Sequence, residues 1–175
     1  YRSTGTTWYP FSGGAGRATA LVSGTSVAST SGTSIDFTGI PSWVKRITVM
    51  FNGISTNGAS NYQIQIGAGS VTTTGYLSVS SVISLSSVGS VAFTAGFGIQ
   101  NGAGATTAVS QGAITLYLLS GNVWVANGLL SNSDGVRTVN SAGSITLGGT
   151  LDRVRITTVN GTDTFDAGSI NLLFE

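Results

Sequence analysis

The chain has 175 residues with neither cysteine nor histidine, and its charged residues make up only 7% of the sequence, for a net charge of +1. An average soluble domain has about 25% charged residues, so this surface must consist largely of Ser, Thr, Asn, Gln and Gly. The composition excludes disulfides and thiolate metal sites. It leaves no basic patch for binding nucleic acid, and it permits copies of the chain to associate without strong repulsion.

The first residues differ from the rest of the chain. Aromatic residues and proline at 8–11 lead into a glycine-rich run at 13–16. We interpret residues 1–18 as the end of a preceding element plus a flexible joint, and residues 19–175 as one domain. The start lacks the regions of a signal peptide, and no run of 18 apolar residues predicts membrane insertion. We expect the chain to be the C-terminal part of a longer protein.

Apolar and polar residues then alternate along most of the chain, which is typical of half-buried β-strands. The predicted strands, in chain order, are 20–28, 34–37, 43–51, 62–66, 77–85, 91–99, 114–118, 123–126, 144–147, 153–157 and 170–174. In 77–85 the residues Leu77, Val79 and Ile83 share one face, with serines between them.

Five Asn-Gly pairs, beginning at residues 52, 57, 101, 127 and 160, suit tight hairpin turns between these strands. No segment has the 3.6-residue period of a capped helix. About ten short antiparallel strands in one domain predict an all-β protein, an antiparallel β-sandwich with jelly-roll-like connectivity and long polar loops.

The sequence offers little for catalysis. Without histidine there is no Ser-His-Asp triad and almost no zinc site, and the serines lack an activating base other than Lys45. A glycosidase needs two carboxylates, and the closest pair is Asp163 and Asp166. An Asp after an Asn-Gly turn usually binds its own backbone in an Asx-turn, so we interpret this pair as structural. No EF-hand spacing is present, although loop oxygens leave a structural calcium open. We therefore expect no enzyme activity, catalytic residue, metal ligand or cofactor.

Long polar loops on a rigid scaffold remain as the candidate binding region. They are predicted at Asn52–Asn61, Ser86–Ser90, Asn101–Ser110 and Asn127–Gly143. Neutral amides and hydroxyls beside an aromatic ring suit a neutral ligand such as a glycan. The candidate ligand-binding residues are Asn57, Asn61, Tyr62, Asn101, Trp124, Asp134 and Arg137. The alternatives are that Trp124 belongs to the core, and that Asp134 and Arg137 form a turn and pair with each other.

Two stretches of the sequence, Ala28–Phe51 and Leu151–Asn171, resemble the C-terminal domain of tail-fibre proteins from tailed phages and prophages. With the residues around them, they cover about half the chain. The resemblance implies a homotrimeric, β-rich fibre tip of the virion that binds a host surface glycan such as lipopolysaccharide. It supplies no catalytic or binding residues for transfer. Two other functions stay open, a structural cap that trimerises the fibre and, further away, a polysaccharide-cleaving enzyme.

Overall fold

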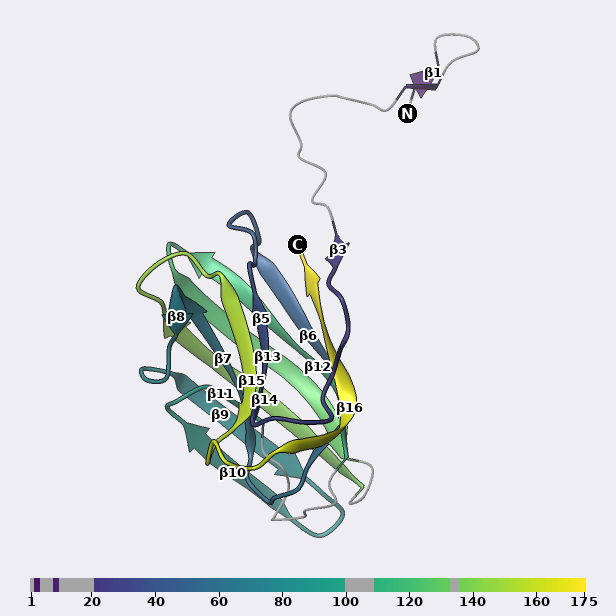
Figure 1. The fold of residues 1–175 in the computed structure, drawn as a ribbon, viewed down its shortest axis with the longest axis vertical. Helices are drawn as coiled ribbons and strands as arrows, with labels where there is room; N and C mark the ends of the chain where they lie inside the picture. Colours follow the sequence, from purple (N-terminus) through teal and green to yellow (C-terminus); the bar gives the residue numbers. More distant parts are fainter. Residues whose placement is uncertain (1, 4–7, 10–20, 100–108, 133–135) are drawn as a thin grey trace.

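The computed structural model describes residues 2–3, 8–9, 21–99, 109–132 and 136–175, and every regular element among them is a β-strand (Figure 1). The strands of the first half are β1 (Arg2–Ser3), β2 (Trp8–Tyr9), β3 (Val22–Ser23), β4 (Val27–Ala28), β5 (Ser34–Thr38), β6 (Arg46–Thr56), β7 (Tyr62–Ala68), β8 (Ser70–Val71), β9 (Leu77–Ile83), β10 (Val88–Phe93) and β11 (Phe97–Ile99). The strands of the second half are β12 (Ser110–Ser120), β13 (Val123–Asn132), β14 (Arg137–Thr146), β15 (Arg153–Thr158) and β16 (Phe165–Phe174). The predicted all-β class is confirmed.

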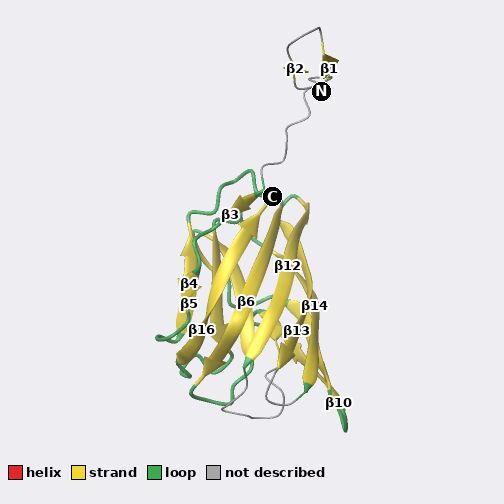
Figure 2. Cartoon of the chain, turned by 90° about the vertical axis from the view of Figure 1, so that its right-hand side faces the viewer, coloured by secondary structure: helices red, strands yellow, loops and turns green. Residues whose placement is uncertain are grey.

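Two antiparallel sheets pack face to face. The large sheet has the strand order β10-β9-β14-β13-β12-β6-β16-β3, with β4 also paired to β16. The small sheet has the order β11-β7-β15-β5, with β8 paired to β7. In Figure 2 the long strands β16, β6 and β12 run side by side along the length of the molecule. The predicted antiparallel β-sandwich is therefore confirmed.

The connectivity departs from a jelly roll, which is built from two Greek keys. Strands β12, β13 and β14 instead form a meander of sequential neighbours within the large sheet. The β9–β10 hairpin extends the same sheet beyond β14. The result is a large sheet with many more long strands than the small sheet.

The core lies between the sheets and consists of the inward residues of alternating strands. The central members, none of them exposed, are Ile47, Val49, Ile114 and Leu116 of the large sheet and Ile64, Ile66, Val154 and Ile156 of the small sheet. Within each of these strands, the two core residues are separated by one residue, because successive side chains of a β-strand point to opposite faces. The predicted strands 43–51, 62–66, 114–118 and 153–157 therefore contribute their alternating apolar residues to this core.

Tyr76 adds a polar anchor to this core. Its ring meets Phe97 edge-on, with ring centroids 5.1 Å apart. Its hydroxyl accepts a hydrogen bond from the Ile66 N–H at 2.8 Å and lies 3.1 Å from the Thr72 carbonyl oxygen, to which it donates. Burial raises the pKa of Tyr76 to about 12. The neutral phenol thus fixes the turn between β7 and β9.

The prediction that Asn-Gly pairs make turns is wrong for two of them. Asn52-Gly53 lies inside β6, where Gly53 has a φ of 66° and the pairing with β16 changes register. Asn127-Gly128 lies inside β13, where a Cβ on Gly128 would sit 2.4 Å from the Ala113 carbonyl oxygen. In these pairs glycine serves a bulge and a close approach between strands.

Several predicted boundaries also change. The predicted loop Asn52–Asn61 shortens to 57–61, Ser86–Ser90 becomes 84–87, and most of Asn127–Gly143 belongs to β13 and β14. The predicted strand 91–99 is divided between β10 and β11, which lie in different sheets. Trp43, the first residue of the predicted strand 43–51, precedes β6 and is 41% exposed. Serine, asparagine and glycine within strands hid these elements, since they favour loops in most sequences.

The sandwich has two distinct ends. At one, which we call the terminal end, β3 pairs with the last residues of β16, and the Lys45 N–H donates to the Glu175 carbonyl oxygen. The opposite end, which we call the distal end, contains the last residues of β6 and β13 and the first residues of β12 and β14. Figure 1 shows β3 and the C-terminus together at the upper end of the sandwich, with the distal end below.

Candidate binding end

Strand register brings the strand ends that flank the predicted binding loops together at the distal end. Ser110 pairs with both Ile54 of β6 and Asn132 of β13, and Asn132 pairs with Arg137 of β14. The described strand ends on either side of 57–61, 100–108 and 133–135 therefore lie at the same end of the sandwich. Two more connections, 84–87 and 159–164, join them there, because β9 pairs with β14 and β15 pairs with β7. The candidates Asn101 and Asp134 lie outside the described residues.

Hydrogen bonds brace two of these loops against each other. The Asn57 amide oxygen accepts from the Thr164 N–H at 2.9 Å, and the Asn57 N–H donates to the Thr164 carbonyl oxygen at 3.0 Å. The Asn61 carbonyl oxygen accepts from the Val159 N–H at 2.8 Å. Because these bonds involve backbone groups at both ends of segment 57–61, its shape is fixed by segment 159–164.

Asp163 lies at the centre of this brace. Its carboxylate accepts from the Ser60 N–H at 3.0 Å and from the Asn160 side-chain amide at 2.6 Å. It also lies against Gly58, where a Cβ would be 2.0 Å from the carboxylate oxygen. The predicted Asx-turn is formed by Asn160, whose amide oxygen accepts from the N–H groups of Thr162 and Asp163. The prediction that Asp163 binds its own backbone is wrong, since its carboxylate bonds across to the neighbouring loop.

The second carboxylate of the pair, Asp166, accepts a hydrogen bond from the Ser55 hydroxyl. Both carboxylates therefore hold strands and loops together, as the structural interpretation predicts. No group of three or more metal-ligating side chains comes together among the residues that the structure describes.

The two aromatic candidates are not on the surface. Tyr62 is fully buried and stacks on Phe165, with ring centroids 6.2 Å apart. Trp124 is 2% exposed, as its alternative place in the core predicts. It borders a hollow of about 100 Å³ beside Lys45 and Asn122, at the terminal end. Neither ring presents a face on which a sugar could stack, so the prediction that they bind ligand is wrong.

The polar candidates have different positions. Asn57 is exposed at the distal end, with its amide oxygen used in the brace, while Asn61 is half-buried beside it. Arg137 begins β14 at the same end and is also half-buried. These three residues share the distal end, and their side chains stay candidates for ligand contact.

Sequence reasoning missed Val136, which precedes Arg137. It has a φ of 46° and is 83% exposed. A β-branched residue rarely adopts this left-handed conformation, and strained residues cluster at functional sites. The only sequence signal was its place after Asp134-Gly135, since positive φ cannot be read from a valine. Val136 is therefore an additional candidate at the distal end.

Comparison with known proteins identifies no relative: no family model, curated protein or solved structure matches the chain. Within the part of the chain that the structure describes, there is no helix with the length and apolar character needed to cross a membrane.

Proposed function

We propose that this chain is the tip domain of a tail fibre of a phage or prophage virion, which binds a glycan on the host bacterial surface through its distal end. The observation that carries the proposal is topological. The strand ends that flank residues 57–61, 100–108 and 133–135 lie together at the end of the sandwich opposite to β3 and Glu175. A domain attached through its terminal end would direct these strand ends outward, as adsorption requires. The resemblance of Ala28–Phe51 and Leu151–Asn171 to tail-fibre proteins supports the same assignment.

The chemistry of the distal end suits a neutral, hydroxyl-rich ligand. Its connections are rich in asparagine, serine, threonine and glycine, which donate and accept hydrogen bonds without requiring a charged ligand. The brace between 57–61 and 159–164 holds part of this surface in one shape, which reduces the entropy lost on binding. No buried aromatic contributes, so contact depends on amides, hydroxyls, Arg137 and the exposed Val136.

A homotrimer would make such a shallow surface effective. A single glycan site usually binds weakly, but linked sites raise avidity by roughly 10²–10⁴ where the geometry allows simultaneous contact. We propose that three copies present their distal ends in the same direction. The domain needs no catalytic step, cofactor, nucleic acid or membrane insertion for this role.

The proposal is tested by adsorption of the purified, fluorescently labelled domain to bacteria with defined surface-glycan defects. The test variant is the double substitution Asp134→Ala with Arg137→Ala. The matched control is Asp36→Ala with Arg155→Ala, which removes an exposed ion pair of the same composition from the small sheet. We expect the distal variant to lose at least tenfold in adsorption and the control to keep the parent value. If both variants adsorb like the parent, the 133–137 segment is not the site.

The competing functions give different results in the same experiment. A purely structural trimerisation cap forms the assembly but does not adsorb to any strain of the panel. A polysaccharide-cleaving enzyme releases reducing ends from the purified surface glycan, whereas a binding tip releases none. Adsorption that is lost on strains lacking one glycan, without release of reducing ends, is the result that supports the proposal.

A further inference from the structure

In β9 the apolar side chains that alternate with serines face away from the core instead of into it. Ser78, Ser80 and Val82 face the small sheet and are buried, whereas Leu77, Val79 and Ile83 face outward and are 75%, 51% and 48% exposed. The sequence suggested one face of apolar residues, and that face is the uncovered side of the sandwich.

The buried serines satisfy their hydroxyls within the fold. Ser78 accepts from the Gly98 N–H at 3.1 Å and donates to the Ala142 carbonyl oxygen at 3.2 Å. Ser80 donates to the Asn140 carbonyl oxygen at 3.1 Å. These hydrogen bonds hold Ser78 and Ser80 on the inward side of β9, so the apolar side chains that alternate with them stay on its outward side.

The outer face of the large sheet continues this apolar surface and contains no charge at its centre. Its seven long strands are β10, β9, β14, β13, β12, β6 and β16, which we call the outer face strands. Their charged residues are Arg46, Arg137 and Asp166, each at the first or second position of its strand. The most exposed of the other apolar residues on these strands are Val88 (77%), Leu119 (68%) and Leu129 (53%).

The small sheet has the opposite character. Its outer face has the ion pair Arg155–Asp36 midway along β15 and the edge strand β5, and Arg153 pairs with the neighbouring Asp152. The Arg153 guanidinium, bonded to Asp152, lowers the pKa of that carboxyl. One side of the sandwich therefore has the charge pattern of a solvated surface, and the other does not.

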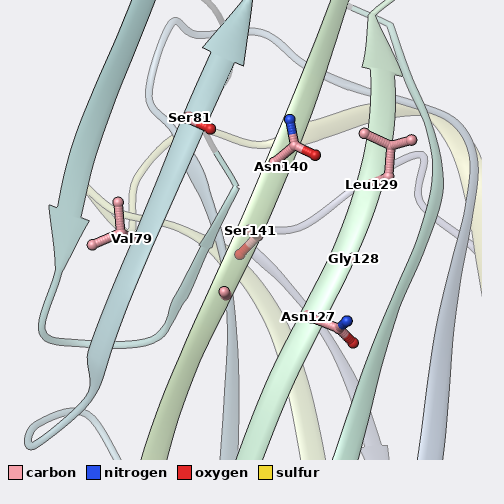
Figure 3. A pocket seen from close by; sticks show the side chains of 8 residues that line it. Val79, Ser81, Asn127, Gly128, Leu129, Asn140 and Ser141 are labelled. Atoms are coloured by element: carbon pink, nitrogen blue, oxygen red, sulfur yellow. The ribbon is translucent and has the colours of Figure 1, made fainter.

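A shallow groove of about 560 Å³ runs along β14 on the outer face. Figure 3 shows Val79 of β9 on one side of β14 and Leu129 of β13 on the other, with Asn140 between them. Ala142 also lines the groove. Small residues on the central strand between apolar neighbours leave space that an inserted side chain would fill.

We infer that the outer face of the large sheet, together with its edge strand β10, packs against a second copy of this chain. Three observations support this inference, and the first of them selects a copy over a different partner. The first is charge: near a symmetry axis a residue meets its own counterpart, so a charge there would face a like charge. The outer face has charges only at its strand ends, so two copies can meet there without placing like charges opposite each other. An interface with a different partner could instead use complementary charges at its centre.

The second observation is area. Seven strands about 4.8 Å apart, with roughly nine residues each at about 3.3 Å per residue, give a face of about 1,000 Å². A stable interface buries about 800 Å² on each partner. The outer face is therefore large enough for a lasting contact between copies.

The third observation is the edge of the sheet. Strand β10 has the sequence VGSVAF, with no charge and no proline, and all but its last residue are exposed. Natural edge strands are usually protected by charge, proline or a covering element. A neighbouring copy would cover β10, and an axis parallel to the strands would point all distal ends in one direction.

The inference identifies the surface through which two copies of the chain meet. It rests on the proposed function only for the number of chains in the assembly, which that proposal sets at three. It is tested with Leu129→Glu, which puts a charge at the centre of the outer face. The matched control is Thr38→Glu, an exposed position on the outer face of the small sheet. Particle mass is measured by light scattering across micromolar concentrations, and circular dichroism verifies that each variant keeps its strands.

We expect the parent and Thr38→Glu to form particles of more than one chain, and Leu129→Glu to be monomeric with at least 100-fold weaker self-association. Because the chain has no cysteine, a second measurement uses Asn140→Cys and Thr38→Cys. The thiol at 140 should react with a maleimide at least tenfold more slowly than the thiol at 38 in the assembled state, and equally fast after dilution.

Assembled Leu129→Glu, or equal thiol reactivity in the assembled state, would overturn the inference while leaving the trimer intact. A parent with one chain per particle would overturn both the inference and the proposed trimer. Neither result affects the adsorption experiment, in which the distal end is tested by its own variants.

Discussion

The brace between Asp163 and Gly58 predicts a strong coupling between two substitutions. Asp163→Ala removes two hydrogen bonds to a carboxylate, those from the Ser60 N–H and the Asn160 amide. Bonds to charged groups contribute about 1.5–3 kcal/mol each when buried, and less here because the site is partly exposed. We expect Asp163→Ala to lower the free energy of unfolding by about 2 kcal/mol.

Gly58→Ala should have a similar effect for a different reason. The new methyl group would lie 2.0 Å from the carboxylate oxygen, so Asp163 must move and lose the same bonds. The backbone of Gly58 has no positive φ, so the methyl group adds no strain of its own. In the double variant the methyl group enters space that the carboxylate has left. We therefore expect a combined loss of about 2 kcal/mol, where independent effects would give about 4 kcal/mol.

The cycle is measured by urea denaturation of the four proteins at one fixed chain concentration, because self-association contributes to apparent stability. A loss of 2 kcal/mol should also lower Tm by roughly 4–8 °C for a chain of this size. Additive losses in the double variant, or an unchanged stability of Gly58→Ala, would show that Asp163 does not hold the 57–61 loop.

Three further predictions concern the interior. Tyr76→Phe should lower the free energy of unfolding by about 1–3 kcal/mol in urea denaturation, because the buried Ile66 N–H loses its acceptor. Raising the pH should destabilise the protein through the same residue. The pKa of Tyr76 is about 12 in the folded protein and about 10 in the unfolded chain, so its contribution is complete below pH 10 and is lost as pH rises towards 12. A denaturation series from pH 8 to 12 checks this, and Tyr76→Phe should flatten it. Ser141→Ala should cost about 1 kcal/mol, since the Ser141 hydroxyl donates to the Gly98 carbonyl oxygen across the sheets at 2.6 Å; equal urea midpoints for parent and variant would refute it.

The sequence predicted the fold where inward residues are large and apolar. In β6 and β7, the isoleucines and valines that alternate with polar residues lie in the core as expected. Strand β14 was found only at its end, because Ser141 and Gly143 occupy inward positions. A buried serine and an exposed serine look alike in a sequence, and only the hydrogen-bond partner distinguishes them. The same ambiguity reversed the facing of β9.

The sequence predicted the candidate residues one by one, without showing which of them lie at the same end of the sandwich. Asn57, Asn61 and Arg137 share one end of the sandwich, but this follows from strand register, which local patterns do not determine. Trp124 and Tyr62 were selected for their ring chemistry, and both rings fill the core. In a chain with few charged residues, many uncharged polar positions look equally suited to binding. Burial then decides between them, and burial depends on the paired sheets.

Val136 has a strained backbone and lies in the proposed binding surface, so substitutions at this residue test both the strain and the binding role. A left-handed conformation costs a residue with a Cβ about 1–2 kcal/mol, and glycine adopts it without that cost. Val136→Gly should therefore raise the free energy of unfolding by about 0.5–1 kcal/mol after the added flexibility of the unfolded chain is subtracted. Val136→Ala removes the branch but keeps the Cβ, so it should recover only part of that gain. If the exposed valine contacts the glycan, both variants should adsorb more weakly to host cells, so the glycine variant would be more stable and less active. A glycine variant that is less stable than the parent would contradict the strain argument, and one that is more stable with undiminished adsorption would remove Val136 from the proposed site.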